Sequence, residues 1–307
     1  MKVRIGTRGS KLALWQANYI KDKLDGGGLE TEIVTIDTKG DKILDVSIAK
    51  IGSKGVFTEE IEEQLAQGTI DIAVHSAKDM QSTLPEGFEL IAFTEREVVN
   101  DIVLSHKKDV SLENNIVLGT SSTRRMALLK KYYPHIKTVP VRGNLQTRIR
   151  KMEEGECDAL LLAYAGAHRM GYNEMIVAKL DTAKFIPAVG QGSVAVECST
   201  ELNTAKKETI RALTNHPETE IQLLAERAFL RKLEGGCSIP VFALAQLQHD
   251  KVILEGGIIS LDGKEKVLHK TYSSTKEPEL AGEELADKVL DNGGDVILNE
   301  IKTQLNK

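Results

Sequence analysis

The sequence predicts two doubly wound α/β domains that form a two-lobed unit, followed by a small α+β domain with a three-stranded antiparallel sheet. Strand and helix patterns alternate through residues 3–198, and three strands with alternating apolar residues stand together at about 240–248, 251–260 and 265–273. Alternation of strands with helices is typical of parallel sheets, whereas consecutive strands are typical of antiparallel ones. A chain of 307 residues is long enough for this arrangement.

Composition and charge favour a globular protein that binds neither nucleic acid nor membrane. The net charge is −5, and no apolar run approaches the roughly 18 residues of a membrane span. The first residues lack the apolar stretch of a signal peptide, and the three cysteines and seven histidines show no disulfide or metal-ligand spacing. We expect a cytoplasmic protein without a metal, and a monomer because no heptad or apolar stripe demands a partner.

The first domain begins with a strand at residues 3–7, a helix at about 11–24 that Ser10 caps, and a second strand at 31–37. This order predicts a parallel βαβ unit, so Arg8 and Ser10 lie at the carboxyl end of the first strand, where open α/β sheets bind ligands. A buried strand at 70–75 leads in the same way to Lys78 and Asp79.

A long connection at residues 39–57 interrupts this pattern and carries Lys42, Lys50 and Lys54. Connections of this length are usually functional or lack order. We interpret the segment as a basic lid over the site, with a solvated surface loop as the alternative. A helix at about 58–67 follows it.

The second domain repeats the strand–helix order. A strand at 116–119 leads through hydroxyl residues, Ser122 among them, to Arg124 and Arg125 in the first turn of a helix that ends near Tyr133. Arginines in a first turn oppose the helix dipole unless an anion compensates them. The pattern therefore favours a carboxylate or phosphate site, and a pair of solvated surface arginines is the alternative.

Further arginines follow strands at 137–141 and 158–162, and Asn144 is expected to cap the intervening helix. The arginines near these strand-to-helix junctions are Arg142, Arg148 and Arg169. Six arginines at sheet edges imply a ligand with several carboxylates or phosphates, because guanidinium groups grip both with paired hydrogen bonds. Positive charge nearby favours the ionised form of Asp79, which can then stabilise cationic character in the ligand.

The segment 187–192 contains glycines and Gln191, and we expect it to return the chain to the first domain. Domain 1 is then 1–95 with a return segment at about 194–213, domain 2 is 99–190, and domain 3 is 216–307. In domain 3 a helix at 217–233 precedes the three strands, and helices near 278–291 and 295–305 follow them. His75, Cys157 and Cys198 are interpreted as structural.

Cys237 follows two glycines between the helix at 217–233 and the first strand of domain 3. The glycines leave the thiol uncrowded, and Pro240 ends any helical continuation. An ionised thiol is a good nucleophile, so Cys237 is a candidate covalent anchor. A turn whose cysteine has no function is the alternative.

The motifs together resemble the porphobilinogen deaminase family nearly end to end. They are GTRGSKLALWQ at 6–16, GDK at 40–42, GSKGVFTEEIE at 52–62, AVHSAKDM at 73–80, GTSSTRR at 119–125, RGNLQTR at 142–148, AYAGAHRMG at 163–171, PAVGQG at 187–192 and EGGC at 234–237. The resemblance implies two lobes hinged like periplasmic binding proteins and a third domain that carries the cofactor-anchoring cysteine.

The resemblance also implies a dipyrromethane cofactor with four carboxylates, joined to Cys237 by a thioether. The cofactor-binding residues would be Lys78, Ser122, Arg124, Arg125 and Asp41. The substrate-binding residues would be Arg8, Ser10, Arg142, Arg148 and Arg169. Lys50, Lys54, Phe57 and Gln191 would lie in the lid or near the site, and Asp79 would be catalytic.

The implied reaction deaminates four porphobilinogen molecules and joins them head to tail on the covalent primer. Asp79 would bind pyrrole N–H groups and stabilise the positive charge as ammonia leaves. Hydrolysis would then release linear hydroxymethylbilane, a step of tetrapyrrole and haem biosynthesis. A non-catalytic two-lobed anion-binding protein is the alternative, which needs neither the third domain nor the thiol and would normally carry an export signal.

Overall fold

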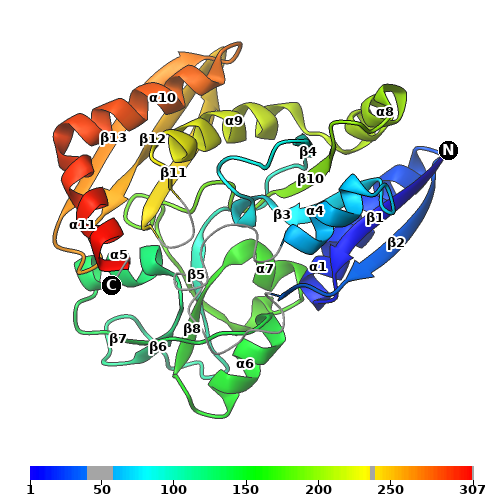
Figure 1. Cartoon of the computed structure of the whole chain (residues 1–307). Coiled ribbons are helices and arrows are strands. Elements are labelled where there is room, and N and C mark those ends of the chain that lie inside the picture. Colours follow the sequence, from blue (N-terminus) through cyan, green and yellow to red (C-terminus); the bar gives the residue numbers. More distant parts are fainter. Residues whose placement is uncertain (40–57, 236–238, 306–307) are drawn as a thin grey trace.

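The computed structural model describes residues 1–39, 58–235 and 239–305, which form two five-stranded sheets and one three-stranded sheet (Figure 1). Helices cover these sheets, and the three-stranded sheet lies at the opposite end of the molecule from β1 and β2. The predicted fold class is confirmed in its parts: two mixed sheets with helices, and a small antiparallel sheet near the C-terminus.

The first sheet has the strand order β2-β1-β3-β10-β4. Its strands are β1 (Lys2–Arg8), β2 (Glu30–Ile36), β3 (Ile72–Ser76), β4 (Phe88–Phe93) and β10 (Val194–Ser199). β1 pairs in parallel with β2 and β3, as the βαβ pattern predicts, and β10 runs antiparallel between β3 and β4. The helices that accompany this sheet are α1 (Lys11–Gly26), α4 (Glu59–Ala66) and α8 (Thr204–Thr214). β10 therefore brings the chain back beside β3, the strand that leads to Lys78 and Asp79.

The second sheet has the order β7-β6-β8-β5-β9. Its strands are β5 (Asp101–Leu104), β6 (Val117–Gly119), β7 (Lys137–Val139), β8 (Ala159–Ala163) and β9 (Ile176–Lys179). Its helices are α5 (Thr123–Tyr132), α6 (Leu145–Glu153) and α7 (Tyr164–Arg169). The strand predicted at 137–141 ends early because Pro140 has no N–H for the ladder. The edge strand β9 was not predicted, since four residues carry too little periodicity.

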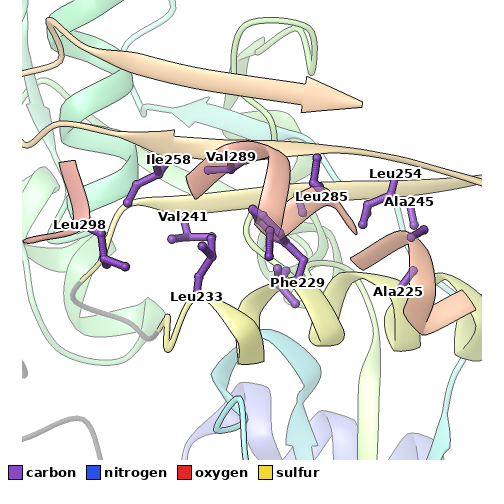
Figure 2. Close-up of a cluster of buried hydrophobic side chains, with 14 of the residues drawn as sticks. Ala225, Phe229, Leu233, Val241, Ala245, Leu254, Ile258, Leu285, Val289 and Leu298 are labelled. Atoms are coloured by element: carbon purple, nitrogen blue, oxygen red, sulfur yellow. The ribbon is translucent and has the colours of Figure 1, made fainter. Parts of the chain in front are cut away.

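The third sheet consists of β11 (Val241–Gln248), β12 (Lys251–Ile259) and β13 (Lys266–Ser274), all antiparallel. Three helices pack on it: α9 (Pro217–Lys232), α10 (Pro278–Val289) and α11 (Asp295–Leu305). Figure 2 shows their shared core, where Phe229 and Leu285 from the helices meet Leu254 from β12. These side chains are fully buried, and each contributes about 1.5–3 kcal/mol by leaving water.

A buried carboxylate joins the third sheet to the two connections between the other sheets. Glu226 of α9 accepts a two-point contact from Arg96, which lies on the outgoing connection between β4 and β5 (2.6 and 3.1 Å). The same carboxylate accepts hydrogen bonds from the backbone N–H of Gly190 on the return connection and of Ala245 in β11, both at 2.9 Å. One fully buried side chain thus connects the third sheet to both connections between the other two sheets.

Candidate active site

Lys78 and Asp79 lie on a single 3-10 turn, Ala77–Asp79, directly after β3. The return connection packs on this turn, because the N–H of Ala77 donates to the carbonyl of Ser193 (3.0 Å). Gly190 has a φ of +74°, and a Cβ at that position would lie 2.9 Å from the carbonyl carbon of Ala77. Only glycine combines this backbone angle with so close an approach. Asp79 is exposed and Lys78 half-buried.

Arg124 and Arg125 begin α5, where the Ser122 hydroxyl caps the helix by accepting from the N–H of Arg125 (3.4 Å). Both arginines are buried, so the alternative of a solvated surface pair is wrong. Asp101, at the start of β5, lies 2.8 Å from the nearest guanidinium nitrogen of each. Asp101 therefore supplies negative charge that compensates the two arginines in the first turn of α5.

Asp101 is ionised in spite of its burial. Desolvation opposes its ionisation, but Arg124 and Arg125 outweigh that cost and hold the pKa of this carboxyl well below its usual range. One carboxylate faces two guanidinium groups here, so positive charge remains for a bound anion. That remaining charge is the electrostatic feature expected of a site for an acidic ligand.

The two sheets share one electrostatic site. Burial, followed by the charge of Arg125, lowers the pKa of Lys78 to about 8, while Asp79 and Asp101 act in the opposite direction. Such mutual effects need short distances, because solvent and salt screen charges that lie far apart. Lys78 of the first sheet is therefore within electrostatic range of the arginine pair of the second.

Arg148 and Arg142 belong to the same site. Asn144 caps α6 by accepting from the N–H of Thr147 (2.9 Å), and the Nε of Arg148 donates to the carbonyl of Gly143 (2.8 Å). Burial, followed by the charge of Arg125, lowers the pKa of Arg148; Asp79 opposes the shift and Arg142 adds to it. The cap that the sequence predicted at Asn144 thus fixes the start of α6, the helix that carries Arg148.

The remaining predicted residues are Arg169 at the end of α7 and Arg8 and Ser10 near the start of α1. Arg169 stacks on the ring of Trp15 in α1 (5.1 Å) and donates to the carbonyl of Gly192 (2.7 Å). Ser10 caps α1 by accepting from the N–H of Ala13 (3.3 Å), and Arg8 is half-buried at the end of β1. In this structure Arg169 bridges the two sheets, which adds a structural contact to its predicted role.

Gln191 is buried, and its amide nitrogen donates to the carbonyl of Val99 (2.7 Å) and to Asp101 (3.0 Å). This places a residue that the sequence assigned to the neighbourhood of the site directly against its buried carboxylate. Five other predicted site residues lie outside the described residues: Asp41, Lys50, Lys54, Phe57 and Cys237.

Sequence reasoning missed Asp101 and Glu226. In the sequence, Asp101 is a polar residue directly before an apolar run, and Glu226 is one of several acidic residues in a helix. The only signal was indirect: two adjacent arginines at a helix start require an anion, but the pattern does not say which one. Both partners are distant in the sequence, so only the folded chain identifies them.

The charge balance of the site fits a ligand with several carboxylates. Arg124 and Arg125 pair with Asp101. Lys78, Arg142 and Arg148 add positive charge in the same region, and Asp79 is a second carboxylate there. Across residues 1–39, 58–235 and 239–305, no group of three or more His, Cys, Asp or Glu side chains is placed to hold a metal ion. Fold and site together define a mixed α/β protein with a cationic site, in which arginine and lysine side chains follow strands of two sheets.

Family models and relatives identify the family. Residues 3–207 match the model described as "Porphobilinogen deaminase, dipyromethane cofactor binding domain", and residues 221–291 match "Porphobilinogen deaminase, C-terminal domain". Porphobilinogen deaminases of Desulfosudis oleivorans and Cytophaga hutchinsonii are 56% and 59% identical to the chain over 307 residues, covering 99% of this chain and 99% and 98% of theirs. The chain therefore belongs to the porphobilinogen deaminase family.

Solved structures with a similar fold include the VFT2 domain of Bordetella pertussis BvgS and the methionine-binding protein MetQ. They share 15% and 14% identity at a TM-score of 0.42 each, over 70% and 69% of this chain and 84% and 89% of theirs. In the described part of the chain, no helix has the length and apolarity that crossing a membrane requires.

Proposed function

We propose that this chain deaminates porphobilinogen and joins four molecules head to tail on a dipyrromethane primer, releasing linear hydroxymethylbilane and ammonia. The observation that carries the proposal is the cationic site that Lys78 forms with Arg124 and Arg125, within a chain of the porphobilinogen deaminase family. A substrate and a cofactor with several carboxylates match the surplus of positive charge there.

The cofactor would be held by Lys78, Ser122, Arg124, Arg125 and Asp41, with its covalent attachment at Cys237. Charge pairing supports the arginines and the lysine in this role, because a guanidinium binds a carboxylate with two parallel hydrogen bonds. Once bound, the dipyrromethane group supplies the pyrrole carbon that acts as a nucleophile. The protein's task is to hold it in one orientation, which lowers the entropic part of the barrier.

The incoming substrate would be bound by Arg8, Ser10, Arg142, Arg148 and Arg169. The charge of Asp79 favours the protonated form of Arg148. A substrate carboxylate bound by Arg148 would then place the pyrrole ring near the carboxylate of Asp79. Lys50, Lys54, Phe57 and Gln191 would complete the surroundings of the bound rings. Contacts to the acidic side chains of the substrate, rather than contacts to its reacting carbon, would thus orient it.

Asp79 would be the catalytic residue. Its exposed carboxylate follows Lys78 on a turn that the return connection holds in place. An anion in a fixed position accepts hydrogen bonds from pyrrole N–H groups and stabilises the positive charge that develops as ammonia leaves. Because the turn is already ordered, little reorganisation accompanies this stabilisation.

The wider organisation proposed is three domains, at 1–95 with 194–213, at 99–190, and at 216–307, in a monomeric cytoplasmic enzyme. The separate sheets support this division. Size-exclusion chromatography coupled to light scattering tests the monomer, and a mass of twice 33.7 kDa would contradict it.

The intact mass of the purified chain, followed by fragmentation of the peptide that contains Cys237, tests the proposal. We expect a mass higher by one two-pyrrole unit, located on Cys237. If the protein is purified unmodified, incubation with porphobilinogen should add this unit and then release ammonia. A chain that binds porphobilinogen without gaining mass or releasing ammonia would be the two-lobed binding protein of the alternative hypothesis.

A further inference from the structure

Asp101 makes contacts to three side chains of the site from a fully buried position at the start of β5. Its Oδ1 accepts from Nε and Nη2 of Arg125 (3.0 and 2.8 Å) and from the amide of Gln191 (3.0 Å). Its Oδ2 lies 2.8 Å from Nη1 of Arg124. One carboxylate thus contacts both arginines and the return connection.

These contacts determine how the two guanidinium groups are oriented. A guanidinium is planar and carries five N–H donors in a rigid arrangement. Arg124 also donates to the carbonyl of Ile186 (2.8 Å), and Arg125 to that of Leu161 (3.1 Å). Asp101 and one backbone carbonyl therefore fix the plane of each guanidinium group, and this plane sets the direction of its remaining N–H donors. Asp101 therefore decides where the pair can grip a ligand.

The charge of Asp101 by itself works against an acidic ligand. A buried carboxylate next to the site lowers the positive potential that attracts carboxylates. If neutralisation were its main contribution, removing its charge would strengthen anion binding. Its geometry argues the opposite, because two adjacent buried guanidinium groups repel each other and would separate without a shared partner.

We infer that Asp101 is a positioning residue, which orients Arg124 and Arg125 toward the carboxylates of the bound group and couples them through Gln191 to the return connection. This inference rests on the proposed function, since the bound group is the polycarboxylate that the arginines would hold. Asp101 itself touches neither substrate nor cofactor in this assignment.

Two variants separate position from charge. Asp101→Asn keeps the size of the side chain and removes its charge, whereas Asp101→Glu keeps the charge and displaces the carboxylate by one methylene group. Glu197→Gln is the matched control, because Glu197 is also fully buried but pairs with His75 (3.0 Å) in the first sheet. All three are made in the full chain, purified from cells that produce no porphobilinogen.

The first readout is the affinity for pyromellitate, a rigid tetracarboxylate, measured by calorimetry. We expect both Asp101 variants to bind it at least tenfold more weakly than the unmodified chain, and Glu197→Gln to bind it within twofold. Tighter binding by Asp101→Asn, or an unchanged affinity in Asp101→Glu, would overturn the inference, because charge rather than position would then explain the contact.

The second readout is the gain of mass on incubation with porphobilinogen. The unmodified chain and Glu197→Gln should gain the two-pyrrole unit at similar rates, and both Asp101 variants at least tenfold more slowly. If the unmodified chain gains nothing, the proposed function fails, while the pyromellitate affinities still decide on Asp101. If all variants gain mass equally fast, only the inference fails.

Thermal unfolding shows whether the Asp101 variants are folded. Should either fail to fold, Gln191→Met removes the amide that joins Asp101 to the return connection and leaves the carboxylate in place. We expect this variant to bind pyromellitate about threefold to tenfold more weakly. An unchanged affinity in Gln191→Met would contradict the coupling.

Discussion

Arg96 and Glu226 form a two-point ion pair across 130 residues of sequence, at the place where the two connections meet the third sheet. Both side chains are buried, at 8% and 0% exposure. The carboxylate also accepts two backbone N–H groups, so its burial is compensated by hydrogen bonds as well as by charge. The side chain of Glu226 therefore links α9 to the outgoing connection, to the return connection and to β11.

Glu226→Gln should lower the free energy of unfolding by about 3–5 kcal/mol, because it leaves the guanidinium of Arg96 buried without a counter-charge. Urea unfolding measures this. The control is Glu279→Gln, which breaks the exposed pair with Arg231 (3.1 Å) and should cost no more than about 1 kcal/mol. Equal losses of unfolding free energy in the two variants would mean that the buried pair stabilises the fold no more than the exposed pair does.

Asp79→Asn should leave the fold and the bound cofactor intact and reduce kcat by about 100-fold to 1,000-fold, since the amide cannot stabilise positive charge. Ammonia release measures turnover, and intact mass reports the cofactor. Asp22→Asn, on the exposed side of α1, should retain full activity. Near-normal turnover in Asp79→Asn would remove this residue from the mechanism.

Cys237→Ser should yield a folded chain that never gains the two-pyrrole unit. The other two thiols cannot replace it, because burial raises the pKa of Cys157 to about 11 and that of Cys198 to about 12, which leaves almost no thiolate. Iodoacetamide at pH 8 should modify only Cys237 in the cofactor-free chain, and Cys198→Ala should still load. Mass gain by Cys237→Ser would refute the attachment site.

Lys78 should make anion binding depend on pH. Burial and Arg125 lower its pKa to about 8, so its ammonium predominates at pH 7 and is progressively lost as the pH rises through 8. Bound carboxylates favour the ammonium, and each pH unit above 8 should therefore weaken pyromellitate binding by up to about tenfold. Calorimetry at pH 7 and 9 measures this in the cofactor-free chain. Lys78→Arg stays charged throughout and should show little change, and a slope equal to that of the unmodified chain would exclude Lys78 as its source.

Gly190→Ala should displace the turn that carries Lys78 and Asp79. The substitution combines a positive φ with a Cβ only 2.9 Å from the carbonyl carbon of Ala77. The matched control is Gly28→Ala, which has a φ of +82° and nothing within 4 Å of its Cβ. Backbone strain should lower the free energy of unfolding of both variants by about 1 kcal/mol. Only Gly190→Ala should also lose most of its turnover. Equal turnover in the two variants would show that the close approach is not needed for catalysis.

Local chemistry explains why much of the fold was predictable. The caps at Ser10, Ser122 and Asn144 each bind a backbone N–H three residues ahead, and that interaction needs no information from the rest of the chain. The strands predicted at 31–37 and 158–162 are found at Glu30–Ile36 and Ala159–Ala163, because their apolar patterns lie between polar residues and leave little choice.

The sequence by itself determined the order of the elements, the family, and the set of cations and carboxylates near the strand ends. Only the tertiary structure decided which of these charges meet. Arg125 lies 24 residues from Asp101, and Arg96 lies 130 residues from Glu226. Side-chain pairing at such separations depends on the order of strands in a sheet and on the packing of helices, which arise from the free energy of the whole chain and leave no local pattern.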